Sequence, residues 1–145
     1  MGALTLSGQL LCQKPPIFTP LSARKQPPLN KSRMKYLISF PSAAMIVPEG
    51  EWEAVVRDSH DVIDQAKAAG VYVFGGGIDE SVPPMLVSAD GSAAEGGYPW
   101  APPLNGGFTV LELPTREEAL AWAARLAQAC RCAQELRVFG FDPQS

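Results

Sequence analysis

The chain has 145 residues, of which 46% are apolar and 19% are charged, and its formal net charge is −3 at pH 7. This length suits one domain, the composition is typical of a globular protein, and no apolar run approaches the roughly 20 residues that span a bilayer. We therefore predict a single-domain protein that does not associate with membranes.

Charge is distributed unevenly along the chain. Residues 1–33 contain five basic residues and no acidic one, so residues 34–145 hold seven basic residues against fifteen acidic ones and carry a net charge of −8. Nucleic-acid binding depends on clustered Lys and Arg, so we expect no nucleic-acid partner. Residues 1–33 also contain five prolines, which interrupt helices and strand ladders. We predict a disordered, Pro-rich basic extension at 1–33 and one domain at 34–145; whether the native chain begins at Met1 or Met34 stays open.

Three cysteines, Cys12, Cys130 and Cys132, and a single histidine limit the metal and redox chemistry of the chain. The odd cysteine count and the lack of repeated CxxC pairs argue against a disulfide framework and a structural zinc site. We expect a reducing, cytoplasmic location, with no metal and no cofactor.

The first half of the predicted domain contains a strand, a helix and a second strand. Residues 35–40 alternate with the period of a strand, residues 51–69 repeat apolar positions at helical spacing, and Gly70 suits the end of that helix. Residues 71–74 predict the second strand, which leads into three glycines at 75–77. The helix face expected to be buried contains Trp52, Val55, Val56, Ser59, Ile63 and Ala66.

The second half repeats this pattern after an insertion. Residues 79–105 predict a small hairpin turning at Asp90-Gly91, followed by a loop rich in Gly and Pro. Residues 108–113 predict a strand, a capping box starts a helix at 115–130, and 136–141 predict the last strand. The order predicts an α+β fold: a ferredoxin-like split βαβ unit with an antiparallel sheet.

The predicted sheet is apolar on both faces. Right-handed crossovers place both helices on one face, yet Leu111 and Leu113 alternate with Phe108 and Val110, which are also apolar. An antiparallel sheet that faces water should alternate apolar with polar residues. We therefore expect a homodimer, with Leu111 and Phe139 close to its interface.

Six short segments are characteristic in their order and spacing: Met34-Lys35-Tyr36-Leu37, Ser59-His60, Ala69-Gly70-Val71, Gly75-Gly76, Gly106-Gly107-Phe108 and Glu117-Glu118-Ala119-Leu120-Ala121-Trp122-Ala123. Over about residues 34–141 they resemble the YCII-related family in its DGPF branch. The family resemblance implies a dimeric α+β barrel built on ferredoxin-like subunits. Where the branch name leads one to expect Asp-Gly-Pro-Phe, this chain has Glu95-Gly96-Gly97-Tyr98, without the proline.

The resemblance also implies a catalytic His–Asp pair in a cleft of the dimer, and the helix position assigns the histidine to His60. No aspartate matches; Glu95 is the nearest analogue if its loop folds back over the helix, and Asp79 is the alternative. Imidazole, with an ordinary pKa of about 6.5, exchanges protons near neutrality, and a carboxylate partner fixes its tautomer. A packed or solvent-contacting histidine with no such role is the other reading.

Three further residues are candidates for substrate binding. Tyr98 and Trp100 lie in the Gly/Pro-rich loop, where large aromatic residues either fill the core or line a pocket. Gly76 belongs to a glycine run that lets a ligand approach the backbone, but no helix follows to bind a phosphate, so a nucleotide is not expected.

Two kinds of function are consistent with these residues. The first is a small-molecule enzyme of lyase or isomerase type in which His60 moves a proton. The second is a non-catalytic binding or accessory protein that uses the same cleft, because one fold serves many functions. A carboxylate close to His60 would favour the enzyme, whereas an exposed, unpaired His60 would favour the binding protein.

Overall fold

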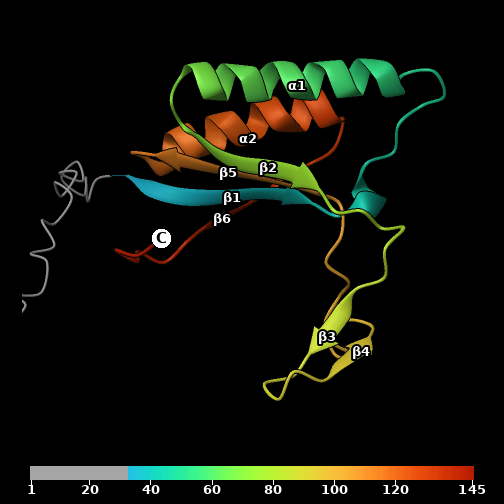
Figure 1. Cartoon of the computed structure of the whole chain (residues 1–145). Coiled ribbons are helices and arrows are strands. Elements are labelled where there is room, and N and C mark those ends of the chain that lie inside the picture. Colours follow the sequence, from blue (N-terminus) through green and yellow to red (C-terminus); the bar gives the residue numbers. More distant parts are fainter. Residues whose placement is uncertain (1–32) are drawn as a thin grey trace, which may run out of the picture.

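The computed structural model describes residues 33–145, so the predicted extension, apart from Arg33, lies outside the described part of the chain. Four strands form one antiparallel sheet in the order β2-β5-β1-β6, and both helices cover the same face of it (Figure 1). This α+β arrangement is compatible with the predicted ferredoxin-like fold. The elements are β1 (Met34–Phe40), a 3-10 turn (Ser42–Ala44), α1 (Trp52–Ala68), β2 (Tyr72–Gly77), β3 (Met85–Val87), β4 (Ala93–Glu95), β5 (Gly107–Leu113), α2 (Arg116–Cys130) and β6 (Glu135–Val138).

The hydrophobic core lies between the sheet and the two helices. Tyr36 of β1 pairs with Leu111 of β5, so the two side chains share the face that the helices cover. Burying such apolar surface is the main stabilising contribution to the fold. The core cluster comprises Tyr36, Ile38, Val62, Ala66, Val71, Leu111, Leu113, Ala119, Ala123, Leu126 and Ala129. Among residues 33–145, no helix is both long enough and apolar enough to cross a membrane.

The helix termini follow from local sequence. Thr115 caps α2, and its side-chain oxygen accepts a hydrogen bond from the backbone N–H of Glu118 at 3.2 Å, as the capping box predicts. Helix α1 ends two residues before Gly70, whose φ of +68° is the left-handed conformation expected after a helix.

Three predictions about buried residues were wrong. Trp52 is 55% exposed because it is the first residue of α1, and the stripe that reaches the sheet begins one turn later at Val55. Val56, the next residue along the helix, points away from that stripe and is 37% exposed. Leu111, expected near a subunit interface, is only 1% exposed and belongs to the core. The pleat of β5 turns Leu111 toward the helices and its neighbour Val110 toward the opposite face.

Two strand boundaries also differ from the prediction. Strand β2 continues through all three glycines, because their backbone pairs with β5 as far as Gly107. Strand β6 ends at Val138 instead of residue 141, although the N–H of Phe139 still donates to the carbonyl of Lys35 at 2.9 Å. Strand β1 begins at Met34, which the register places opposite Gly140, so Phe141 has no β1 residue opposite it.

Residues 79–105 form an arm that projects beneath the sheet, on the side opposite the helices (Figure 1). Its hairpin pairs β3 with β4 and turns at Asp90-Gly91, as predicted. The carboxylate of Asp90 accepts hydrogen bonds from the backbone N–H and the hydroxyl of Ser92, at 2.9 and 2.7 Å, and Gly91 has a φ of +85°.

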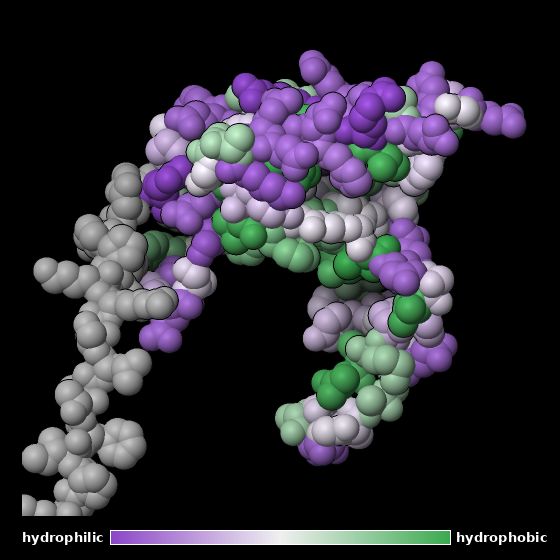
Figure 2. Space-filling model, turned by 45° about the horizontal axis from the view of Figure 1, so that its top comes forward, coloured by the Kyte–Doolittle hydropathy of each residue, from purple (hydrophilic) through white to green (hydrophobic). Residues whose placement is uncertain are grey.

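The sheet face opposite the helices is uncovered within one chain, and we call it the open face. Strand pairing places Leu37, Phe74, Phe108 and Val110 on it, and Phe74 is 63% exposed. Figure 2 shows hydrophilic residues over the helices and hydrophobic residues gathered beneath them and along the arm. An apolar sheet face next to an apolar arm is unusual for a monomer exposed to water.

Candidate functional site

His60 lines a cavity of about 390 Å³ between α1 and the glycine end of the sheet, which we call the His60 pocket. The exposed imidazole lies on α1, and buried or half-buried apolar side chains, Ile38, Ile63 and Leu126, supply the pocket's inner wall. The volume lies within the range of small-molecule sites.

The glycine run of β2 keeps this pocket open. A Cβ atom on Gly75 would lie 3.2 Å from the hydroxyl oxygen of Tyr72 and 3.4 Å from Oγ1 of Thr109. A side chain at this position would crowd both hydroxyl groups and occupy space in the pocket. A Cβ on Gly76 would instead meet the ring of Phe74, which belongs to the open face, at 3.7 Å.

Two hydroxyl groups and one ammonium group give the pocket its polar character. Tyr72 and Thr109 line it from β2 and β5, and within residues 33–145 neither hydroxyl takes part in a hydrogen bond. Nζ of Lys67 lies 5.4 Å from the centroid of the Tyr72 ring and 3.3 Å from Oδ1 of Asp64. Both partners of this ion pair are mostly exposed, so it contributes little to stability.

The two cysteines near the pocket are protonated at neutral pH. Burial raises the pKa of the Cys130 thiol to about 11, and burial also raises the pKa of Cys132. Both are free thiols, and only Cys130 lines the His60 pocket. Because the thiolate is the nucleophilic form, Cys130 contributes packing to this site and is not a nucleophile near neutral pH.

Neither predicted carboxylate partner lies at the His60 pocket. Asp79 begins the arm, where its carboxylate accepts hydrogen bonds from the hydroxyl and the backbone N–H of Ser81 at 2.6 and 3.0 Å. Those bonds lower the pKa of Asp79. Glu95 is the last residue of β4, pairs with Met85 and is exposed. Within residues 33–145 no ion pair joins His60 to a carboxylate, so the loop does not fold back over α1 as the pairing with Glu95 required.

The three predicted substrate-binding residues fall into two places. Gly76 lines the His60 pocket. Tyr98 lines a separate, larger cavity of about 590 Å³ at the base of the arm, where Asp79 is also found. Trp100 is 80% exposed and packs on Tyr98 with the ring centroids 5.0 Å apart.

The larger cavity in the arm is a weaker candidate for chemistry than the His60 pocket. Its walls are mostly apolar or proline side chains, among them Ile78, Val82 and Leu104, and its ionisable side chains are Asp79, Glu80 and Tyr98. The His60 pocket combines an imidazole, an ammonium and two hydroxyl groups, which can transfer a proton or hold a polar ligand. We therefore place the candidate site at the His60 pocket.

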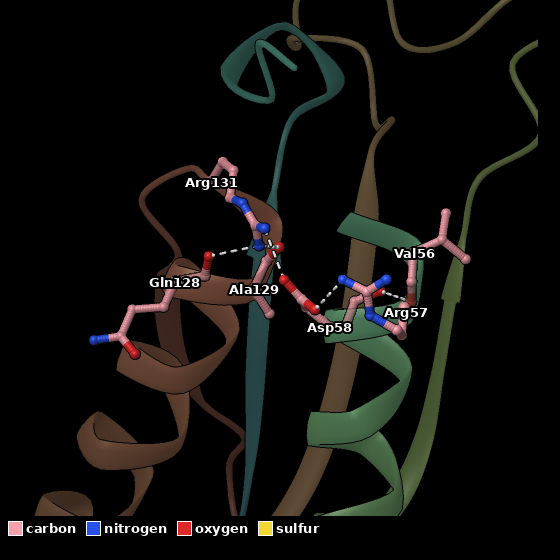
Figure 3. A network of polar contacts seen from close by, with 7 residues as sticks. Val56, Arg57, Asp58, Gln128, Ala129 and Arg131 are labelled. Atoms are coloured by element: carbon pink, nitrogen blue, oxygen red, sulfur yellow. Dashed lines mark hydrogen bonds and ion pairs between the residues drawn. The ribbon is translucent and has the colours of Figure 1, made fainter. Parts of the chain in front are cut away.

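A polar network on the other side of α1 fixes the two helices relative to each other. Arg131 ends α2 in the left-handed conformation, and its guanidinium donates to the carboxylate of Asp58 on α1 at 2.7 Å and to the carbonyl of Ala129 at 2.6 Å (Figure 3). The Arg131 hydrogen bond holds the pKa of Asp58 below its ordinary value. Within residues 33–145 no cluster of three or more His, Cys, Asp or Glu side chains could hold a metal ion, and the Asp58 carboxylate serves as a structural partner.

Sequence reasoning did not select Tyr72, Thr109 or Lys67. The sequence did contain a clue for two of them. Lys67 is near the end of a helix and Tyr72 begins the next strand, so the turn between the two elements brings these residues close together. The pairing register of β5 with β2, which brings Thr109 opposite Gly75, is not visible in the sequence. No family model and no curated protein sequence matches this chain, so the resemblance to the YCII-related family depends on the residues quoted above.

Proposed function

We propose that this protein binds a small organic molecule in the His60 pocket and belongs to the YCII-related proteins. The observation that carries the proposal is that the only histidine of the chain lines an open cavity together with the hydroxyl groups of Tyr72 and Thr109. Gly75 supports the same proposal, because any larger residue there would fill part of the pocket. Protein interiors without a ligand are normally filled by side chains.

Catalysis of lyase or isomerase type is the more specific form of this proposal. His60 would accept or donate a proton on the bound molecule, and the Tyr72 and Thr109 hydroxyl groups would donate hydrogen bonds to an oxygen on which negative charge develops. Asp79 and Glu95 have no part in this version, because both lie in the arm.

A non-catalytic binding or accessory role is the second candidate, and one observation favours it. Within residues 33–145 no carboxylate orients His60, and the imidazole is exposed. General acid–base catalysts usually have a second group that fixes the tautomer of the imidazole. Ligand binding in the pocket is common to both candidates and is therefore the property to test first.

We further propose a homodimer that buries the open face, in a reducing compartment such as the cytoplasm. The apolar side chains of Leu37, Phe108 and Val110 on that face support the dimer, as in the α+β barrels that the family resemblance implies. The free thiols of Cys130 and Cys132 support the compartment.

A fragment screen observed through the protein tests the binding proposal. Because the chain has one histidine, the imidazole C–H signals in the NMR spectrum belong to His60 without further assignment. We expect a subset of fragments to shift these signals in a saturable manner. A diverse screen at millimolar concentration in which no fragment moves them would contradict the proposal.

Two glycines provide the matched variants. Gly75→Val should abolish binding, because its side chain enters the space beside Tyr72 and Thr109. Gly140→Val adds the same side chain outside the pocket, at a position where a Cβ meets nothing within 4 Å, and should preserve binding. Equal binding by the two variants, each shown to be folded by circular dichroism, would place the ligand elsewhere.

A further inference from the structure

The His60 pocket differs in charge from the domain that contains it. Residues 34–145 carry fifteen acidic residues against seven basic ones, yet no carboxylate lines this pocket among the residues that the structure describes. Its charged wall residue is Lys67, which shares the wall with the imidazole of His60. The pocket lining is therefore positively charged, although the domain as a whole has a negative electrostatic field.

Lys67 is available to a ligand. Its ammonium group contacts the exposed carboxylate of Asp64 at 3.3 Å, in a pair that water screens and a competing anion can replace. The ring of Tyr72 lies 5.4 Å from Nζ and holds the ammonium group on the pocket side of α1. The Lys67 side chain is therefore held at the pocket by Tyr72, while Asp64 neutralises its positive charge only weakly.

The remainder of the pocket suits an apolar body. Ile38 and Leu126 are almost fully buried, and Ile63 is partly buried. The protonated Cys130 thiol adds no charge to this wall. A ligand that reaches from Lys67 to these side chains would place one end in a polar environment and the other in an apolar one.

We infer that the His60 pocket selects organic monoanions, such as carboxylates with a compact apolar body, whose acidic group binds at Lys67. This inference deepens the proposed function and depends on it. A neutral ligand would form no ion pair with Lys67, and a cationic ligand would find no carboxylate in the pocket lining to pair with.

Three probes of matched shape test the charge preference: 3-phenylpropanoate, 3-phenylpropan-1-ol and 3-phenylpropylamine. We expect calorimetry on the full chain to give the tightest binding for the carboxylate and the weakest for the amine. Nuclear Overhauser contacts between the phenyl protons and the imidazole protons of His60 locate the probe. Equal or tighter binding of the amine would overturn the inference.

Lys67→Gln is the decisive variant, and Lys35→Gln, on a strand outside the His60 pocket, is its control. An exposed charge pair contributes up to about 1 kcal/mol, so Lys67→Gln should weaken carboxylate binding about fivefold. The same variant should leave the affinity for the alcohol unchanged, and Lys35→Gln should affect neither ligand. Equal loss for carboxylate and alcohol, or no loss for either, would overturn the assignment of Lys67.

The two proposals fail in distinguishable ways. If the alcohol and the amine bind beside His60 as well as the carboxylate does, the pocket is a small-molecule site and the anion preference is wrong. If no probe binds there, the anion inference is overturned, and the fragment screen with the two glycine variants decides separately whether the pocket binds anything.

Discussion

His60 is an exposed residue at the edge of a cavity whose wall also includes the buried side chains of Ile38 and Leu126, and its exposure predicts the effect of replacing it. Within residues 33–145 it makes no ion pair, so its removal disturbs little of the folded structure. A histidine packed in the core would behave differently, because its loss would leave a cavity or an unpaired polar group.

We predict that His60→Asn changes the free energy of unfolding by no more than about 0.5 kcal/mol, as for other surface substitutions. If the pocket is catalytic, turnover of its substrate should fall by roughly 10²–10⁴-fold. Urea denaturation followed by circular dichroism measures the first quantity. A stability loss of several kcal/mol would show that His60 is structural.

The Cys130 thiol gives a prediction of pH dependence. Because its pKa in the folded protein is about 11, above the ordinary 9.0, the folded state retains this proton at pH values where the unfolded state loses it. Stability should therefore decrease as the pH rises from about 9 to about 11. In a Cys12→Ser, Cys132→Ser background, alkylation of native Cys130 by iodoacetamide should accelerate over the same range. Rapid alkylation at pH 8 would contradict the assignment.

At the scale of elements, the Asp58–Arg131 pair joins α1 to the end of α2. We predict that Asp58→Asn lowers the melting temperature at pH 7, because it removes the charge that binds the guanidinium. The lowered pKa means that this contribution is present above the ordinary value of 3.8 and is lost as the pH falls through the lower, folded value. The difference in melting temperature between the wild type and Asp58→Asn should therefore become smaller at acidic pH. Asp61→Asn, at an exposed site on the same helix, is the control and should change little.

The base of the arm depends on one glycine. A Cβ on Gly106, whose φ is +82°, would lie 2.0 Å from the carbonyl oxygen of Phe40. We predict that Gly106→Ala costs about 3 kcal/mol of stability, from backbone strain together with this collision. Gly140→Ala, where a Cβ meets nothing within 4 Å and φ is not positive, should be nearly neutral in the same denaturation experiment.

At the scale of the whole molecule, substitutions at two neighbouring residues of β5 test dimerisation and folding independently. Val110 lies on the open face and Leu111 in the core. We predict that Val110→Asp yields a folded monomer, whereas Leu111→Asp unfolds the chain, because burying an unpaired charge costs several kcal/mol. Sedimentation equilibrium and circular dichroism distinguish the two. A wild-type protein that sediments as a monomer at micromolar concentration would remove the dimer from the proposal.

The apolar surface of the arm and of the open face also supports the proposed homodimer. A two-stranded hairpin such as β3–β4 has little stability by itself, and Met85 and Val87 on it are exposed. Such an element is stabilised when a second surface covers it. Covering by a second copy is consistent with the proposed dimer, which the Val110→Asp variant tests.

The sequence by itself determined the order and type of the elements. Alternation at 35–40, helical spacing after Gly50, the Thr115 cap and the Asp90-Gly91 turn are local signals, and local interactions decide these features in the folded chain as well. It also identified His60 and Gly76, which do line one pocket.

Only the tertiary structure decided what surrounds them. The register of β5 with β2 brings Thr109 beside Gly75, the pleat sends Leu111 inward, and the direction of the arm keeps Glu95 and Asp79 away from His60. Each of these depends on how segments far apart in the chain are paired. A one-residue change in register would turn every side chain to the other face, and residue type alone does not specify that choice.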